Sequence, residues 1–560
     1  MTQTLGRSGS PLVDHLFKHS ARHPRSIALV SGGGSVTWGE LAEQVDVIAD
    51  HLRDMALPRA GLVGVPVGRD AVSLLRILAV SRASLTPFLF DRDQPSGHAS
   101  AQLQSAGAWF MRDDGRVERP SLTSTGSGLG PAAYALATSG STGGPKVVSV
   151  ANEAVRRYEC GLLGRLGSNG PLSALLLYPL CVDIGMTAVV AAFATGGTLH
   201  ILGEAGVRDP GVLARYIAEN EIDLLKITPS HLYAVQQGDP TAAVPRRLLI
   251  LGGEPVPSGF AQSLVRANPG CAVYNHYGPS ETAVGVSMHR LTPSIDASAP
   301  VCLGDPLPGV DFAVGAGSEL LIQVGESGLG YVGDPRETAR RFVPDPTTGA
   351  ARGTRVFRSG DEVRLDESGR PVFVARLDDQ VKIRGHRVDL GEVDAALRSL
   401  DGIEDAAAAV DAQRVVAIVV SGGTWEPLAV IGEMRAILPE PMVPNVMAIA
   451  SAVPRGMSGK VDRARVLELA KAQAPRPADA LGPAPAPGGL VGQILNVLAD
   501  TLGSDDLTAE ADFFEHGGDS LLAMTAVWQI RLETGIEVTL ADLVEGRSAQ
   551  GLSQLLSAGN

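Results

Sequence analysis

A segment rich in glycine and hydroxyl groups follows a short apolar run at residues 132–137. Its glycines let backbone N–H groups turn inward around an anion, while its hydroxyl groups and final lysine add donors and a positive charge. The segment therefore predicts a phosphate-binding loop, made of Thr138, Ser139, Gly140, Ser141, Thr142, Gly143, Gly144, Pro145 and Lys146. It is not a Walker A loop, because Pro145 separates the glycines from the lysine and Val147 follows. A P-loop kinase or ATPase is therefore disfavoured.

The same segment resembles the TSGSTGxPK signature of the acyl-adenylate-forming superfamily, which holds nonribosomal peptide synthetase adenylation domains, acyl-CoA synthetases and luciferases. The resemblance implies that the loop binds ATP and that Lys146 stabilises the reacting phosphates. Residues 274–282 resemble the NxYGPTE motif of the same superfamily, with Ser280 in place of threonine. In this motif Tyr277 can stack on adenine, Asn275 can read the adenine edge, Ser280 can donate to the α-phosphate, and Glu281 can hold Mg²⁺.

Three later positions resemble further motifs of the superfamily. Asp361, in FRSGD, is expected to accept hydrogen bonds from the ribose hydroxyls, since a carboxylate accepts two such bonds well. By the same resemblance Phe373 and Arg376 lie at the nucleotide, and Asp378 is the hinge between a large and a small subdomain. Lys460, in SGKVDR, is expected to stabilise charge on the substrate carboxylate and the phosphate as they react.

The C-terminal part carries a different signature. Residues 472–489 form a Pro/Ala/Gly linker. The following DFFEHGGDSLL resembles a peptidyl carrier protein, with Ser520 as the attachment point for 4′-phosphopantetheine. Ser520 is expected to begin a helix, whose N-terminus favours a phosphodiester. The resemblance therefore points to an adenylation domain fused to a carrier domain and disfavours luciferase or a free acyl-CoA synthetase.

The residues expected to line the amino-acid pocket transfer from the superfamily by position. They are Asp183, Ile184, Thr187, Lys226, Ile250, Gly252, His276, Val284, Gly285 and Lys460, and as a set they resemble an aspartate-type pocket. Asp183 is expected to bind the substrate α-ammonium group. Taken alone, Lys226 would be expected to extend its amine to the surface, but the resemblance brings it and His276 to one small cavity.

The predicted pocket suits a short side-chain carboxylate. A nearby anion should favour protonated His276, so that both basic groups donate. The neutral amide of asparagine would leave a buried charge poorly matched, at a cost of about 1–3 kcal/mol or about one to two decades in preference. Asparagine and a β-substituted aspartate stay open as alternatives, the latter because Gly252 and Gly285 could leave room.

The alternation of helical and strand-like apolar patterns predicts an α/β multi-domain protein. We expect a large N-terminal subdomain with mixed sheets and helices at 1–376 and a small α+β subdomain at 377–471. After the linker at 472–489, an all-α four-helix carrier domain is expected at 490–558. The expected chemistry has two steps, in which L-aspartate reacts with ATP to give aspartyl-AMP and the phosphopantetheine thiol then displaces AMP.

Composition restricts the partners. The formal net charge of −14 argues against nucleic acid, and the four scattered cysteines suggest neither disulfides nor a zinc site. No run of eighteen apolar residues or signal peptide is present, which predicts a cytoplasmic protein without a membrane partner. A phosphopantetheinyl transferase and a downstream enzyme acting in trans are expected partners, because condensation and thioesterase motifs are lacking. The need for an MbtH-type activator stays open.

Two other classes of function compete with amino-acid activation. An acyl- or aryl-acid ligase with a fused carrier would have no use for Asp183 as an ammonium ligand. A binding module without catalysis would not need Lys146, Glu281, Asp361 and Lys460 together. The expected biological context is nonribosomal peptide or other secondary-metabolite biosynthesis, including antibiotics.

Overall fold

The computed structural model describes residues 9–558 except 56, 113–114, 119–131, 139–145, 168–169, 237–238, 298, 324–327, 346–353, 384–385, 412–413, 422–426, 456–460, 474–488, 503–506, 515, 517, 519, 535 and 537. Its contacts divide the chain into two compact units. The first holds residues 1–204, 217–229 and 244–389, and the second holds 205–216, 230–243 and 390–560. The first unit thus continues to Asp389, beyond the boundary expected after residue 376.

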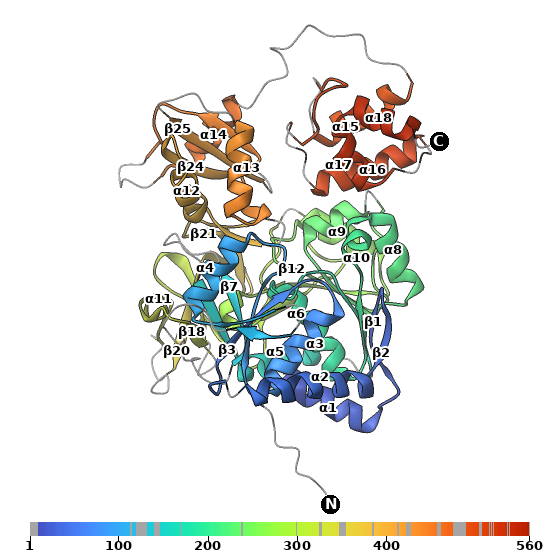
Figure 1. Ribbon diagram of the computed structural model, residues 1–560, viewed down its shortest axis with the longest axis vertical. Coiled ribbons are helices and arrows are strands. Elements are labelled where there is room, and N and C mark those ends of the chain that lie inside the picture. Colours follow the sequence, from blue (N-terminus) through green and yellow to red (C-terminus); the bar gives the residue numbers. More distant parts are fainter. Residues whose placement is uncertain are drawn as a thin grey trace, which may run out of the picture. The chain divides into compact units, whose positions relative to one another are not determined.

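A mixed sheet of nine strands carries Lys226, Ile250, Gly252 and His276 of the predicted amino-acid pocket; β12 of this sheet is labelled in Figure 1. Its six central strands are parallel, and antiparallel strands complete both edges. In spatial order the strands are β15 (Asp305–Pro306), β14 (Ser287–Arg290), β13 (Ala272–Tyr277), β12 (Leu248–Gly252), β11 (Leu224–Ile227), β9 (Ser173–Leu176), β10 (Thr198–Ile201), β1 (Ile27–Ser31) and β2 (Gly34–Thr37).

A second mixed sheet of seven strands carries the ends of the predicted phosphate loop. Thr138 ends one strand and Lys146 begins its antiparallel neighbour, so the two lie side by side in register. In spatial order these strands are β18 (Gly328–Tyr331), β8 (Lys146–Ala151), β7 (Ala132–Thr138), β4 (Thr86–Asp91), β3 (Leu62–Val67), β5 (Trp109–Met111) and β6 (Val117–Glu118).

Helices pack between these two sheets and bury a common core. Apolar side chains at helical spacing, such as Leu41, Val45 and Leu52, face this core and are almost fully buried. The helices before residue 390 are α1 (Pro11–Arg22), α2 (Trp38–Asp54), α3 (Ala71–Arg82), α4 (Ser96–Ala106), α5 (Asn152–Leu166), α6 (Met186–Thr195), α7 (Glu204–Arg208), α8 (Pro210–Glu219), α9 (Pro229–Gln236), α10 (Ser258–Ala267) and α11 (Pro335–Arg341).

The nucleotide and hinge motifs lie on a third sheet and a hairpin of the first unit. Asp361 and Arg376 are register partners across two strands of this sheet, and the hairpin follows directly in sequence. The strands are β16 (Phe312–Val314), β17 (Glu319–Gln323), β20 (Arg355–Leu365), β19 (Phe342–Pro344) and β21 (Pro371–Arg376), with β22 (Gln380–Ile383) and β23 (His386–Asp389) forming the hairpin.

The C-terminal elements have the predicted character. Among the described residues, three strands and three helices lie between residues 390 and 473, and four helices then form a bundle with its own apolar core (Figure 1). The elements are α12 (Leu390–Arg398), β24 (Ile403–Asp411), β25 (Arg414–Ser421), α13 (Pro427–Ile437), β26 (Val446–Ile449), α14 (Arg463–Gln473), α15 (Leu490–Leu502), α16 (Ser520–Thr534), α17 (Leu540–Gly546) and α18 (Ala549–Ala558). Within the described residues, no helix combines the length and apolar character that crossing a membrane requires.

Candidate active site

Asp183 supplies a buried carboxylate at the start of a short 3₁₀ helix (Asp183–Gly185) that leads into α6. Burial raises the pKa of Asp183, while a hydrogen bond from Ser280 and the charges of Lys382 and Lys226 lower it. Its Oδ2 atom is buried and has no hydrogen-bond partner among the described residues. A buried carboxylate oxygen without a partner is costly, so this position suits a cationic ligand such as an ammonium group.

Lys226 and His276 come from β11 and β13, which are separated by β12. Both side chains are buried, at 3% exposure each, and Lys226 Nζ lies 2.5 Å from His276 Nδ1. A Cβ at Gly252 of β12 would lie 2.7 Å from His276 O and 3.2 Å from Lys226 Cε and Nζ, so this glycine leaves space for both neighbours. The two predicted basic residues of the pocket are therefore in direct contact.

Without a ligand, the protein favours the neutral form of His276, and the expected protonation of His276 beside a substrate anion stays a prediction. Burial, together with the charges of Lys226 and Lys382, lowers the pKa of His276 well below its ordinary value. Burial also lowers the pKa of Lys226 to about 7, although Asp183 opposes this shift. A neutral imidazole that accepts at Nδ1 from the Lys226 ammonium carries its proton on Nε2. His276 Nε2 is buried without a partner in the described protein and is thus a donor available to a ligand.

The His276 ring is held from two sides. A Cβ at Gly285 would lie 2.0 Å from both Cε1 and Nε2 of His276, so only glycine leaves space for the ring. On another side the ring meets Tyr158 of α5 in an edge-on contact, with centroids 5.6 Å apart. The Tyr158 hydroxyl lies 2.8 Å from Thr187 Oγ1. The space created by Gly252 and Gly285 is therefore used by Lys226 and His276, which argues against the room expected there for a β-substituent.

A strained turn brings Gly285 against His276. Ala283 and Val284 both have positive φ, at 70° and 56°, and Gly285 N–H donates to Ala283 O at 2.5 Å across this three-residue turn. Such angles are uncommon for residues other than glycine and are an outlier for a β-branched side chain. Both side chains are buried and fixed by the core. The core thus holds this strained turn in place, and the turn forms part of the wall of the predicted pocket.

Three further predicted pocket residues, Thr187, Ile250 and Ile184, are also buried. Thr187 joins the pocket through Tyr158, and Ile250 is the register partner of Lys226 on β12. Ile184 directly follows Asp183 and is also buried. The sequence interpretation missed two tyrosines, Tyr158 and Tyr134, whose buried hydroxyl groups both feel the charge of Asp183. Neither tyrosine belongs to a motif: Tyr134 lies in an apolar run like any core residue, and Tyr158 lies among the charged residues Arg156, Arg157 and Glu159.

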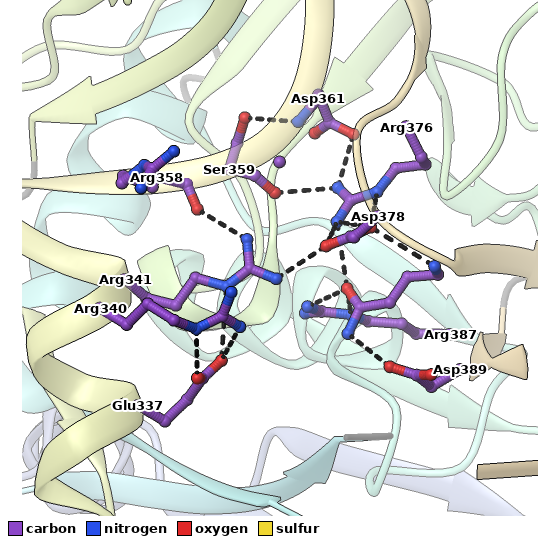
Figure 2. A network of polar contacts seen from close by, with 12 residues as sticks. Glu337, Arg340, Arg341, Arg358, Ser359, Asp361, Arg376, Asp378, Arg387 and Asp389 are labelled. Carbon is purple, nitrogen blue, oxygen red and sulfur yellow. Dashed lines mark hydrogen bonds and ion pairs between the residues drawn. The ribbon is translucent and has the colours of Figure 1, made fainter. Parts of the chain in front are cut away.

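The predicted ribose ligand, Asp361, is bound by two neighbours. Tyr277 Oη donates to Asp361 Oδ2, and Arg376 Nη1 donates to Asp361 Oδ1 at 2.7 Å (Figure 2). These contacts bring three predicted nucleotide residues together, with Phe373 on the same strand as Arg376. Asn275 Nδ2 donates to Cys302 O at 2.8 Å, and its amide oxygen is the group that could accept from an adenine amino group.

The predicted metal ligand, Glu281, is bonded to two side chains of the protein. Arg387 Nη1 donates to both carboxylate oxygens of Glu281, at 2.7 and 2.9 Å, and the Tyr331 hydroxyl donates to Oε1 at 2.7 Å. Burial alone would raise the pKa of Glu281, but Arg387 and Tyr331 lower it, so the carboxylate is charged. The fully buried carboxylate of Glu281 already pairs with one cation, Arg387. Its negative charge and hard oxygen atoms also suit Mg²⁺. A hydrogen bond from Ser280 lowers the pKa of Asp183, and the expected role of Ser280 at the α-phosphate stays a prediction.

The two described ends of the phosphate loop form further contacts. Lys146 Nζ forms a buried ion pair with Glu337 of α11 at 3.0 Å. Thr138 Oγ1 donates to Lys146 O at 3.4 Å. Lys146, the predicted phosphate ligand, is therefore paired with a carboxylate of the protein. Several predicted residues lie outside the described part of the chain, namely Ser139, Gly140, Ser141, Thr142, Gly143 and the proposed catalytic Lys460.

The predicted hinge residue, Asp378, is held by two arginines. Arg341 Nη2 donates to its Oδ2 at 2.7 Å, and Arg376 donates to both of its carboxylate oxygens at 2.7 and 2.8 Å (Figure 2). Because Arg376 also binds Asp361, one guanidinium joins the predicted ribose ligand to the predicted hinge.

The carrier region places Ser520 at the first residue of α16, as predicted. Phe513 is fully buried in the bundle core, and Gly518 N–H donates to Phe513 O at 2.8 Å. A Cβ at Gly518 would lie 2.3 Å from the Phe513 ring, so this glycine lets the loop before α16 pass close to the phenylalanine. The loop therefore fixes where the helix with Ser520 begins.

Comparison with known proteins agrees with this arrangement. Residues 128–335 match the family described as AMP-binding enzyme, and residues 492–556 match the phosphopantetheine attachment site. The chain is 32% identical to the phenyloxazoline synthase MbtB of Mycobacterium sp. (strain MCS), over 98% of this chain and 50% of that protein. It is 28% identical to surfactin synthase subunit 2 of Bacillus subtilis (strain 168), over 97% of this chain and 16% of that protein. The chain thus spans half or less of the length of these relatives.

Solved structures share the fold. Holo-PA1221, a nonribosomal peptide synthetase protein containing adenylation and PCP domains, bound to a vinylsulfonamide inhibitor, has a TM-score of 0.80 at 24% identity, covering 98% of this chain and 97% of that one. The o-succinylbenzoate CoA synthetase MenE of Bacillus subtilis has a TM-score of 0.70 at 17% identity, covering 81% and 98%. The chain thus joins an AMP-binding enzyme domain to a phosphopantetheine attachment domain, on the fold of adenylation–carrier proteins.

Proposed function

We propose that this chain activates L-aspartate with ATP and loads the aspartyl group onto its own carrier domain. The observation that carries this proposal is the buried pair of Lys226 and His276. The pair offers an ammonium charge and a free Nε2–H donor to one small ligand group. Asp183 carries the opposite charge to Lys226. Its Oδ2 atom has no hydrogen-bond partner among the described residues and suits an ammonium group. A substrate that matches both features has an α-ammonium group and a side-chain carboxylate.

The chemistry in the first step is the formation of an acyl phosphate bond. An oxygen of the substrate α-carboxylate attacks the α-phosphorus of ATP, and the bond to pyrophosphate breaks. Asp183 and the Lys226–His276 pair hold the substrate so that its α-carboxylate faces the nucleotide. Asp361, Tyr277 and Arg376 hold the ribose, and Lys146 and Lys460 stabilise charge on the reacting oxygens. Mg²⁺ at Glu281 would neutralise charge on the leaving pyrophosphate.

The second step uses the carrier domain. Phosphopantetheine on Ser520 would supply the thiol that accepts the aspartyl group as a thioester, with release of AMP. The start of α16 at Ser520 supports this assignment, because a helix N-terminus favours a nearby phosphodiester. A phosphopantetheinyl transferase would modify Ser520, and a downstream enzyme of nonribosomal peptide biosynthesis would act on the thioester.

Structural observations favour aspartate over the alternatives. The space beside Gly252 and Gly285 is filled by Lys226 and His276, which disfavours a β-substituent against these walls. Asparagine lacks the charge that would balance Lys226. An acyl or aryl acid would leave Asp183 Oδ2 unpaired. A module without catalysis would not account for the shared contacts of Asp361, Arg376 and Asp378.

ATP–pyrophosphate exchange with L-aspartate, L-asparagine, L-glutamate and succinate tests the proposal. Succinate is aspartate without its amine, so it isolates the contribution of Asp183. We expect exchange with aspartate to exceed exchange with asparagine by at least tenfold and succinate to be inactive. Intact mass spectrometry of the holo protein should then show the aspartyl adduct, which Ser520→Ala should abolish. Equal exchange with asparagine or succinate would reject the aspartate assignment.

A further inference from the structure

Arg387 binds the carboxylate that the proposed function assigns to the metal. One guanidinium nitrogen, Nη1, lies 2.7 and 2.9 Å from the two oxygens of Glu281. The Glu281 side chain is fully buried and that of Arg387 is 21% exposed. The Tyr331 hydroxyl also donates to Oε1. Both oxygens of Glu281 therefore already accept from the positively charged Arg387, and Oε1 also accepts from the Tyr331 hydroxyl.

A divalent ion would use the same two oxygens. Mg²⁺ approaches carboxylate oxygens to about 2.1 Å, which would put its charge against the Arg387 guanidinium. In a buried site these like charges are poorly screened, so the ion and Arg387 compete for the carboxylate. We therefore expect metal binding to weaken the contact of Arg387 with Glu281, and loss of the metal to restore it.

Hydrogen bonds connect Arg387 to the predicted hinge and ribose ligands. Arg387 belongs to β23 of the hairpin, and its Nε donates to Gln380 Oε1 of β22 at 2.8 Å. The same oxygen accepts from Arg376 Nη2 at 3.1 Å. Arg376 in turn binds both Asp378 and Asp361. A continuous chain of hydrogen bonds thus runs from Glu281 to the predicted hinge and ribose ligands, and Figure 2 shows its arginine and aspartate members.

Resting on the proposed function, we propose that Arg387 is a positioning residue that exchanges with the divalent metal at Glu281. With the metal bound, the carboxylate serves adenylation. With the metal gone, Arg387 binds Glu281 and fixes the hairpin of β22 and β23 beside the site. The exchange gives the two half-reactions an order, because the hairpin contact forms only after the metal has left.

The charges of both partners agree with an exchange of cations. Burial alone would lower the pKa of Arg387, but the Glu281 carboxylate raises it. The pKa of Glu281 is lowered by the same contact. Both groups are therefore ionised at neutral pH, and removal of either leaves a buried charge without its partner.

Binding of Mn²⁺ tests the exchange without relying on turnover. Mn²⁺ is titrated into the full chain with saturating AMP, the EPR signal of free Mn²⁺ is followed, and a titration without protein corrects for binding by AMP. We expect Arg387→Gln to bind Mn²⁺ at least tenfold more tightly than wild type, and Arg387→Lys to lie between them. Glu281→Gln, alone or with Arg387→Gln, should remove this site. Arg364→Gln, an exposed arginine on β20, is the matched control and should match wild type.

Hydrogen exchange of the hairpin gives a second readout. Mn²⁺ with AMP should increase exchange in 380–383 and 386–389 of the wild type but not in Glu281→Gln. Thermal melting confirms that each variant is folded. If Arg387→Gln binds Mn²⁺ no more tightly than wild type while Glu281→Gln loses the site, the exchange is overturned and the proposed function stands. If no variant has a Mn²⁺ site that depends on Glu281, the exchange is also overturned. ATP–pyrophosphate exchange then decides separately whether the proposed function survives.

Discussion

Gly285 lies directly against the imidazole of His276, and a methyl group on its Cα would come within 2.0 Å of ring atoms Cε1 and Nε2. The glycine therefore sets where the Nε2–H donor of the histidine points. We therefore expect specificity in the predicted pocket to depend on a residue that contributes no side chain.

Gly285→Ala should displace His276 and weaken selection of the side-chain carboxylate. We expect kcat/KM for aspartate in ATP–pyrophosphate exchange to fall by about one to two decades, as for a lost hydrogen bond to a charged group of about 1.5–3 kcal/mol. Activity with asparagine should fall less. Gly259→Ala is the control, since a Cβ at this glycine of α10 meets no atom within 4 Å. Equal losses for both substrates would contradict the role of Gly285 in selectivity.

Aspartate binding should weaken as the pH rises above about 7. Burial lowers the pKa of Lys226 to about 7, so the free protein loses the Lys226 charge above that pH. The substrate carboxylate requires this charge, so binding must take up a proton, and Kd should rise by up to about tenfold per pH unit. Asp183, Lys382 and His276 are the other titratable groups that act on this site. Calorimetry in buffers of different ionisation enthalpy measures the proton uptake on aspartate binding. A constant Kd from pH 7 to 9 would argue against this uptake.

Asp183→Asn should remove amino-acid activation while keeping the shape of the side chain. Loss of a buried charge that pairs with an ammonium group costs about 3–5 kcal/mol, so exchange with aspartate should fall by at least two decades. Asp54→Asn, at the exposed end of α2, should change nothing. Full activity of Asp183→Asn would show that another group binds the amine.

Gly518→Ala should loosen the carrier bundle and leave the first half-reaction intact. Its Cβ would lie 2.3 Å from the Phe513 ring, and overpacking of this kind costs about 1–3 kcal/mol. Hydrogen exchange of the full chain should therefore increase in α15 and α18, whose side chains share the core with Phe513. ATP–pyrophosphate exchange is the internal control. Unchanged protection of these helices would mean that the bundle adapts to the added methyl group.

Local patterns in the sequence were sufficient to predict the motifs and many elements. The start of α16 at Ser520 follows from a local signature, and the strand with Lys226 follows from its apolar neighbours. The family comparisons confirm the AMP-binding and carrier assignments. The aspartate pocket stays a prediction.

Contacts between distant segments could not be predicted in the same way. Arg387 and Glu281 are 106 positions apart, and no local pattern indicates that a hairpin arginine reaches a predicted metal ligand. The tautomer of His276 depends on the place of Lys226 Nζ, which only the packing of three strands determines. Tyr158 lies among charged residues in the sequence, and nothing local indicates that it is buried against His276. These features arise from tertiary packing and not from motif spacing.

The left-handed backbone at Ala283 and Val284 bears on how the pocket recognises its ligand. Each such residue stores about 1–3 kcal/mol of strain, which persists only where the surrounding core enforces it. The wall that seats His276 is therefore rigid before a substrate arrives, and little conformational entropy remains to be lost on binding. A side chain of the wrong shape meets a surface that does not adapt, so discrimination should appear in the dissociation rate of the first encounter complex.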